Sequence, residues 1–202
     1  MTTRLTRRTL MMSGAAAFSV AATRSILYAA PAETTWHDVQ DWGLEGRGFD
    51  DTEKYFDRLP GRAKGVVRDA VWNLSRHSAG MMLQFRTDAP TIHVDHLVTS
   101  SNLAMPHMAA TGVSGLDLYA RNDAGQWRWV AVTQPNNQHM QTEIASGLRS
   151  GTRDYAIYLP LYNGTESLKI GVPAGQKFEP IAPRVEKPIV FYGTSITHGA
   201  CA

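Results

Sequence analysis

The sequence predicts a mainly β protein, in which a β-sandwich or jelly-roll domain is followed by the start of an α/β domain. Short segments alternate apolar and polar residues with a period of two, and no amphipathic helix of useful length interrupts them. Turn residues are frequent between these segments, with 17 glycines and 10 prolines in 202 residues. The composition, 43% hydrophobic and 19% charged, is that of a globular protein and excludes a disordered or collagen-like chain.

Residues 1–32 are expected to form a cleavable export signal of the twin-arginine type. Basic residues, including the adjacent pair Arg7 and Arg8, precede an uncharged, alanine-rich stretch, and the first acidic residue is Glu33. The uncharged stretch 9–23 is shorter and less apolar than the roughly 20 residues of a membrane span, which argues against an anchor. The mature protein is therefore expected in the periplasm or outside the cell, without a membrane span.

The charge balance changes when this segment is left out. Residues 1–32 contain four arginines and no acidic residue, so 16 Lys and Arg remain against 18 Asp and Glu, a net charge of −2. No basic cluster remains that would neutralise a run of phosphates, which excludes nucleic-acid binding on charge. The one cysteine, Cys201, cannot form a disulfide within the chain, so folding is expected to depend on core packing.

Two alternating segments, 81–87 and 92–98, are predicted to pair as a hairpin. In each, apolar side chains occupy every second position, and residues 88–90 (Asp-Ala-Pro) supply the turn. The same pattern predicts two more hairpins, which join residues 116–120 to 126–132 and residues 155–159 to 168–172.

Asn163-Gly164 lies between the two strands of the last predicted hairpin. Asn-Gly is a strong hairpin signal because both residues tolerate the positive φ that tight turns require. Further short strands are predicted at 66–67 and 71–74, and residues 36–60 are expected to be irregular with at most a short helix.

We place the β-sandwich domain at residues 33–180, and a linker with the start of a second domain at residues 181–202. The apolar run 189–192 (Ile-Val-Phe-Tyr) is typical of a strand buried on both faces of a parallel sheet. Only ten residues follow it, so the chain is expected to be the N-terminal part of a longer protein.

Ser195 lies just past this predicted strand, next to Gly193 and Thr194. Ligand sites of open α/β folds lie at the carboxyl ends of strands, so a serine there can present its hydroxyl to a substrate. Catalysis by serine also requires a general base and hydrogen-bond donors for the developing oxyanion. Of these components the sequence identifies the serine alone.

The segment Phe191-Tyr192-Gly193-Thr194-Ser195-Ile196-Thr197 resembles the first conserved segment of the SGNH (GDSL-type) hydrolases, with Thr194 where the GDSL pattern has Asp. Upstream segments resemble the β-sandwich that precedes the hydrolase domain in one subgroup of secreted SGNH esterases. These segments are Glu45-Gly46-Arg47-Gly48, Arg58-Leu59-Pro60, residues 71–76, Gly115-Leu116-Asp117-Leu118-Tyr119 and residues 158–162.

The resemblance implies an ester hydrolase with a flavodoxin-like catalytic domain and no cofactor, acting on an acyl ester such as an acylated carbohydrate. Ser195 would be the nucleophile, and its backbone N–H one oxyanion donor. The family's other oxyanion donors, a Gly and an Asn, and its Asp-x-x-His dyad are expected beyond Ala202, so this chain alone is expected to be inactive. His198 stands where the subgroup has Gln, and it is disfavoured as a base because positions i and i+3 rarely give an in-line hydrogen bond.

Two further patterns suggest sites that we do not predict. His93, Asp95 and His96 suggest a metal site, but strand alternation puts His96 on the opposite face from the other two, so no metal is expected. Asn163-Gly164-Thr165 matches the N-glycosylation triplet, and we interpret it as a turn.

Trp127 and Trp129 lie on the same side of their predicted strand, where they form either a sugar-stacking platform or, in the interpretation we favour, part of the core. The loop 105–112 either packs on the hydrolase domain or caps the sandwich. A carbohydrate-binding or bracing module without catalysis is therefore the alternative function. The sequence does not identify substrate-binding residues or the oligomeric state.

Overall fold

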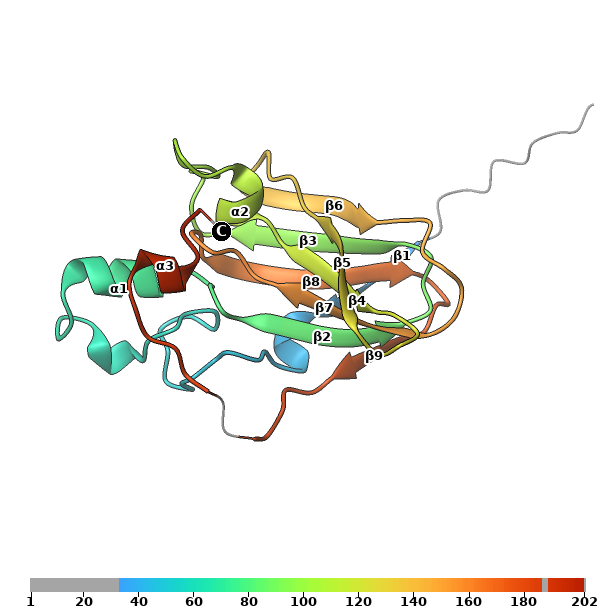
Figure 1. Cartoon of the computed structure of the whole chain (residues 1–202), viewed down its shortest axis with the longest axis horizontal. Helices are drawn as coiled ribbons and strands as arrows, with labels where there is room; N and C mark the ends of the chain where they lie inside the picture. The colour runs from blue at the N-terminus through green and yellow to red at the C-terminus, as the bar shows by residue number, and fades with distance from the viewer. Residues whose placement is uncertain (1–32, 187–188, 202) are drawn as a thin grey trace, which may run out of the picture. The chain divides into compact units, whose positions relative to one another are not determined.

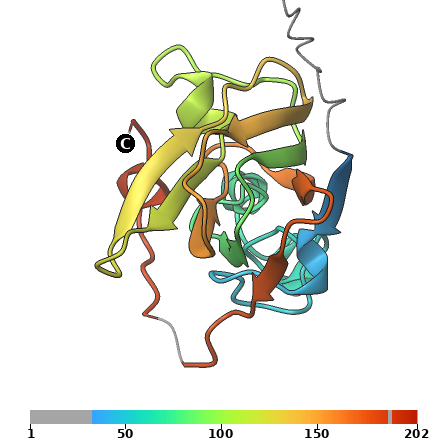
Figure 2. The same cartoon turned by 90° about the vertical axis from the view of Figure 1, so that its right-hand side faces the viewer.

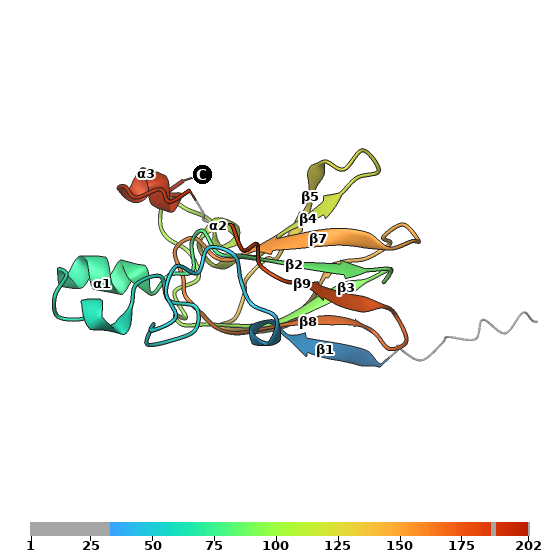
Figure 3. The same cartoon turned by 90° about the horizontal axis from the view of Figure 1, so that it is seen from below.

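The structure, a computed structural model, describes residues 33–186 and 189–201. The export signal predicted over residues 1–32 lies outside these residues. Two antiparallel sheets pack face to face, and Figures 1 and 3 show them as two layers. The predicted mainly β sandwich is confirmed.

The first sheet contains, in spatial order, β1 (Thr34–Asp38), β8 (Thr165–Pro173), β3 (Ile92–Val98) and β6 (His139–Ala145). The second sheet contains β5 (Trp127–Val132), β4 (Asp117–Arg121), β7 (Arg153–Tyr158), β2 (Met82–Thr87) and β9 (Phe178–Ile181). The helices are α1 (Asp69–Ser75), α2 (Ala110–Ser114), α3 (Ser195–His198) and the 3-10 turns η1 (Val39–Asp41) and η2 (Gly61–Ala63). Figures 1 and 3 place the three α-helices at the same end of the sandwich.

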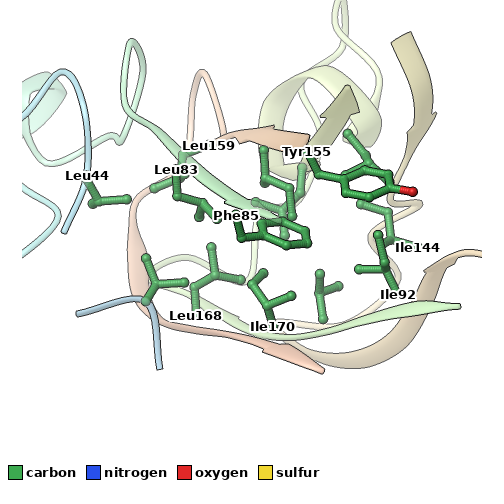
Figure 4. Packing of buried hydrophobic residues seen from close by; sticks show 14 of the residues in the cluster. Leu44, Leu83, Phe85, Ile92, Ile144, Tyr155, Leu159, Leu168 and Ile170 are labelled. Atoms are coloured by element: carbon green, nitrogen blue, oxygen red, sulfur yellow. The ribbon is translucent and has the colours of Figure 1, made fainter. Parts of the chain in front are cut away.

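The core lies between the sheets, because the central strands turn alternate apolar side chains inward. In β3 every second residue is buried, while the residues between them are partly exposed. Figure 4 shows Leu83 and Phe85 of the second sheet opposite Leu168 and Ile170 of the first. Burial of a side chain of this size contributes about 1.5–3 kcal/mol, so this apolar layer supplies much of the free energy of folding.

Two of the three predicted hairpins are wrong, although their strands exist. β2 pairs with β7 and β9, whereas β3 pairs with β6 and β8, so the two strands lie in different sheets. β7 and β8 likewise lie in opposite sheets. Alternation identifies the buried face of a strand but not its hydrogen-bonded neighbour, and a short connection over a shared core permits either a hairpin or a crossing between sheets.

The predicted hairpin between β4 and β5 is confirmed. In its turn the Asn122 N–H donates to the Gln126 carbonyl at 2.9 Å, and Gly125 adopts a φ of 76° that favours glycine. The register shifts between Leu118 and Tyr119, which marks a β-bulge in this pair of strands.

Asn163 is a buried junction, not the tip of a hairpin turn, and the residue is 1% exposed. Its Oδ1 accepts hydrogen bonds from Thr99 Oγ1 and the Ser100 N–H, both at 3.0 Å. Its Nδ2 donates to the Ser100 carbonyl at 2.9 Å and to Ser114 Oγ at 3.0 Å. The chain crosses from one sheet to the other here, and burial makes Asn163 inaccessible as a glycosylation acceptor.

Several element predictions failed for identifiable reasons. Residues 66–67 and 71–74, predicted as strands, form a turn and part of α1. β1, β6 and β9 were not predicted as strands. β6 buries only Met140 and Ile144, and β9 is an edge strand that contains Pro180, so neither carries an alternating apolar signal.

The histidine of β3 that faces inward is buried in the core. His96 is 0% exposed, its Nε2 lies 3.1 Å from Thr165 Oγ1, and its Nδ1 has no hydrogen-bond partner among the described residues. Burial disfavours the imidazolium form and lowers the pKa of His96 from 6.5 to about 4. The folded protein therefore holds this side chain neutral at pH values where an unfolded chain protonates it.

We predict that the free energy of unfolding falls by about 3 kcal/mol between pH 7 and pH 4 on account of His96. Between these values the unfolded state binds a proton that the folded state rejects, so stability is lost as the pH falls. Urea unfolding at both pH values measures the difference. The His96→Leu variant should show a correspondingly smaller loss, and His93→Asn, on the other face of β3, should keep the wild-type loss. An unchanged pH dependence in His96→Leu would contradict the prediction.

Candidate active site

Ser195 is the first residue of α3 and is exposed, as are Ile196 and Thr197 after it. Thr194 precedes the helix in an extended conformation, with φ −82° and ψ −165°. A side chain on Gly193 would meet Thr197, since a Cβ there would lie 2.2 Å from the Thr197 Oγ1. The motif residues thus form a tight turn that leaves the serine facing solvent.

The buried strand predicted over residues 189–192 is not formed. These four side chains are 79–90% exposed, and no strand is assigned to them. A strand of this type requires parallel neighbours on both sides and helices on both faces. The strands described for this chain pair only antiparallel, within the sandwich.

α3 rests on one end of the sandwich through His198. The His198 ring stacks on Tyr162, with ring centroids 4.2 Å apart and an angle of 15° between the planes. His198 Nε2 lies 2.6 Å from the Leu161 carbonyl oxygen and 3.4 Å from Arg58 Nη2. The His77 ring is the next neighbour, with its centroid 5.5 Å from that of His198.

Both histidines at this contact favour the neutral form. Burial, then His198 and then Arg58, lower the pKa of His77 to about 4. Burial, followed by the Arg58 guanidinium, lowers the pKa of His198, against the opposing effect of the Leu161 carbonyl. Among the described residues no imidazole contacts the Ser195 hydroxyl, because His198 is directed toward Leu161.

The segment Gly115-Leu116-Asp117-Leu118-Tyr119 joins α2 to β4, and its residues have different physical roles. Gly115 packs against the end of α2, where an added Cβ would lie 2.2 Å from the Thr111 carbonyl oxygen. Leu116 and Leu118 are 0% exposed in the core. Because side chains alternate along the strand, Asp117 and Tyr119 lie on the outer surface of the second sheet.

Tyr119, Trp129 and Tyr158 form what we call the aromatic face, on the outside of the second sheet. Trp129 is 56% exposed and Tyr158 is 43% exposed. Trp129 Nε1 donates to Asp117 Oδ1 at 2.9 Å, and the ring of Tyr119 meets that of Tyr158 edge-on, with centroids 5.5 Å apart. The prediction that Trp129 packs in the core is wrong, because its side chain lies on the outer surface of β5, beside Asp117. β5 is the edge strand of the second sheet (Figure 2).

Trp127 is also outside the core cluster. It is half-buried, and the guanidinium of Arg121 lies over its ring, 4.9 Å from the centroid. The two tryptophans lie on the same side of β5, as the sequence predicted, but this side faces outward and not into the core. Trp127 is half-buried beside Arg121, whereas Trp129 is exposed. Tyr119 and Tyr158 were missed as partners because their two strands are adjacent only in the folded sheet.

His96 lies on the opposite face of β3 from His93 and Asp95, as strand alternation predicted. His96 is buried, while Asp95 Oδ1 lies 2.7 Å from His139 Nε2 on the outer side of the first sheet. Within the part of the chain that the structure describes, no group of three His, Cys, Asp or Glu side chains is arranged to hold a metal ion.

The loop 105–112 closes one end of the sandwich. Met105 and Met108 form a short backbone bridge, and Met108 is buried against Gly112, where an added Cβ would lie 2.8 Å from the Met108 Cε. The Cys201 thiol lies 3.7 Å from the His107 carbonyl oxygen. This loop therefore caps the sandwich and also contacts the segment that follows α3.

A hollow of about 550 Å³ lies along β5, β6 and their connection. It is lined by residues 132–134, 136–137 and 139–143, which include none of the predicted catalytic residues. None of the helices in the described residues has the length and apolar character needed to cross a bilayer.

Comparison with known proteins identifies the family. The sequence model of the GxDLY family, described as the N-terminus of SGNH-hydrolase-type esterases, matches residues 34–178. A search of curated proteins found no match. A solved structure of a GDSL-like lipase from Bacteroides ovatus is 27% identical with a TM-score of 0.68, and the match covers 73% of this chain and 43% of that one.

The salicylyl-acyltransferase SsfX3 from a tetracycline biosynthetic pathway is 14% identical with a TM-score of 0.52, over 79% of this chain and 43% of that one, and shares the fold. The chain thus spans less than half the length of either solved structure. The five residues that name the family are the segment 115–119 described above. The chain belongs to the GxDLY family, the N-terminal domain of SGNH-hydrolase-type esterases.

Proposed function

We propose that this chain provides the β-sandwich and the nucleophile turn of an exported serine esterase. The family match, together with an exposed serine at the start of α3, supports this proposal. The exported location is proposed from the arginine pair and the apolar stretch within residues 1–32. The likeness to a GDSL-like lipase points to the same class of reaction.

The proposed chemistry is acyl transfer through Ser195. The Ser195 oxygen attacks the ester carbonyl, a general base takes the hydroxyl proton, and the C–O bond to the alcohol breaks as the alcohol receives that proton. Water then hydrolyses the acyl-Ser195 ester and restores the free hydroxyl. The backbone N–H of Ser195 belongs to the first turn of α3, where N–H groups have no partner within the helix, and is a proposed oxyanion donor.

The base and the remaining oxyanion donors are proposed to lie in a catalytic domain beyond the described residues, as the resemblance to SGNH hydrolases implies. His198 is not proposed as the base, because its Nε2 is directed to the Leu161 carbonyl. No cofactor enters this chemistry.

We predict that Ser195→Ala lowers the hydrolysis of p-nitrophenyl acetate by the full-length protein at least about 10³-fold, since it removes the nucleophile. A fluorophosphonate probe should label the wild-type protein and not this variant. Ser150→Ala, a change at an exposed serine in a loop, is the matched control and should keep both activity and labelling. A purified chain of residues 33–202 should show no turnover. Wild-type turnover in Ser195→Ala would disprove the assignment.

A second candidate function is carbohydrate binding by the aromatic face. An open indole ring beside a carboxylate matches the surface of a sugar, which has an apolar C–H face and hydroxyl groups at its edge. Trp129 and Tyr158 supply the exposed rings, and Asp117 supplies the carboxylate. This proposal makes an acylated polysaccharide the substrate class of the esterase.

Trp129→Ala is expected to weaken binding to acetylated xylan about tenfold or more, the loss of roughly one stacking contact. Affinity gel electrophoresis of the full-length protein measures this loss, and activity on p-nitrophenyl acetate should stay unchanged. Phe49→Ala, at an exposed aromatic residue outside the aromatic face, is the control and should bind like wild type. Equal binding by Trp129→Ala and wild type would rule out this role of the aromatic face.

A further inference from the structure

The contacts between α3 and the sandwich converge on a small set of residues, which we call the latch: Arg58, His77, Leu161, Tyr162 and His198. We propose that Tyr162 and His198 are positioning residues that fix the Ser195 turn on the end of the sandwich. This inference rests on the proposed role of Ser195 as nucleophile.

α3 is too short to be stable by itself. It contains four residues, and nucleation of a single helical turn is unfavourable without the further hydrogen bonds that a longer helix adds. Ile196 is 85% exposed, so its side chain contributes little packing. The position of Ser195 therefore depends on contacts made by neighbouring residues with the sandwich.

Hydrogen-bond chemistry assigns the tautomer of His198. Its Nε2 lies 2.6 Å from the Leu161 carbonyl oxygen and 3.4 Å from Arg58 Nη2. A carbonyl oxygen only accepts and a guanidinium only donates, so a single ring nitrogen cannot bond to both. The shorter distance identifies the bond: Nε2–H donates to Leu161, and Arg58 lies beside the ring as a neighbouring cation.

This arrangement favours the neutral form of the His198 ring over the protonated form. The charged and titratable groups around its ring are the Arg58 guanidinium, the His77 imidazole and the Tyr162 hydroxyl. Arg58 is held in place by the carbonyl oxygens of His77 at 2.9 Å and Leu74 at 2.5 Å, where α1 ends. An imidazolium at position 198 would face this fixed cation, so the latch binds the neutral ring.

Tyr162 contacts both ends of α3. Its ring stacks on His198 at the last residue of the helix, and its hydroxyl donates to the Ser195 carbonyl at 3.3 Å at the first residue. Its own N–H donates to the Val113 carbonyl at 3.0 Å, which ties it to α2. One side chain thus links the nucleophile residue to the sandwich.

Gly199 follows α3 and packs against Leu161 of the latch. It has a φ of 100°, a conformation that favours glycine, and an added Cβ would lie 2.9 Å from the Leu161 Cδ1. The Gly199 and Ala200 N–H groups both donate to the Ser195 carbonyl, at 3.1 and 2.9 Å. The orientation of Ser195 is thereby coupled to the fit of residues 198–200 against Leu161.

A positioning role makes a distinct kinetic prediction. Displacement of a nucleophile by about 1 Å can cost on the order of 100-fold in rate while leaving substrate binding nearly intact. In the full-length protein His198→Ala should lower kcat for p-nitrophenyl acetate by about 10- to 100-fold and change KM by less than about threefold.

Conservative variants separate positioning from general destabilisation. His198→Gln keeps an N–H donor that reaches toward the Leu161 carbonyl, and we expect it to restore most of the kcat lost in His198→Ala. Tyr162→Phe keeps the ring but loses the bond to Ser195, so kcat should fall by only about 2- to 10-fold. His93→Ala, on the outer side of β3, is the control and should match wild type.

Hydrogen exchange tests the latch without reference to catalysis. The amides of Gly199 and Ala200 should exchange at least about tenfold faster in His198→Ala, and at near wild-type rates in His198→Gln. The core amides of β3 and β8 should be unchanged in both variants, which would show that the sandwich is folded. Wild-type kcat and wild-type exchange in His198→Ala would overturn the latch.

The two proposals fail in different ways. If Ser195→Ala keeps its activity, the nucleophile assignment is wrong, and the exchange of residues 199–200 still decides whether the latch holds the turn. If Ser195→Ala is inactive while His198→Ala matches wild type in kcat and exchange, the nucleophile stands and the latch is rejected.

Discussion

The packing of apolar side chains between the two sheets determines where the other features of the molecule lie. Leu118 and Ile157 are fully buried because they face the opposite sheet. Side chains alternate along a strand, so the residues next to them, Tyr119 and Tyr158, must point outward. The aromatic face is thus the reverse side of the core, and its position follows from the same alternation that builds the sandwich.

The latch in turn depends on a polar junction at one end of this core. The Asn163 side chain makes five hydrogen bonds in a site with almost no exposure, and loss of such bonds in a buried site is costly. Tyr162 is the preceding residue, and its N–H is bonded to the α2 backbone. The residue whose side chain contacts Ser195 and His198 therefore lies next to a buried, hydrogen-bonded site.

The sequence predicted most strands of the central sheets from the spacing of their apolar residues. It did not predict strand pairing or contacts between segments that are distant in the chain. β2 and β3 were predicted because each buries every second side chain, and β7 and β8 because apolar residues recur along them. The sequence of a single strand does not show which strand it pairs with. Residues 71–74 (Val-Trp-Asn-Leu) are mostly apolar but belong to α1, and β6 lies at an edge with few buried residues. Ser195 is proposed from its local motif, whereas Arg58, His77 and Tyr162 surround α3 from distant parts of the chain, which no local pattern reports.

The apolar run at residues 189–192 is exposed at an energetic cost. Four consecutive residues of high β propensity, Ile-Val-Phe-Tyr, face water almost fully, which costs free energy in proportion to the apolar area. Such a segment gains by pairing with any available strand edge. The residues that lead into the proposed nucleophile turn therefore gain free energy from any strand edge that pairs with them and removes their apolar surface from water.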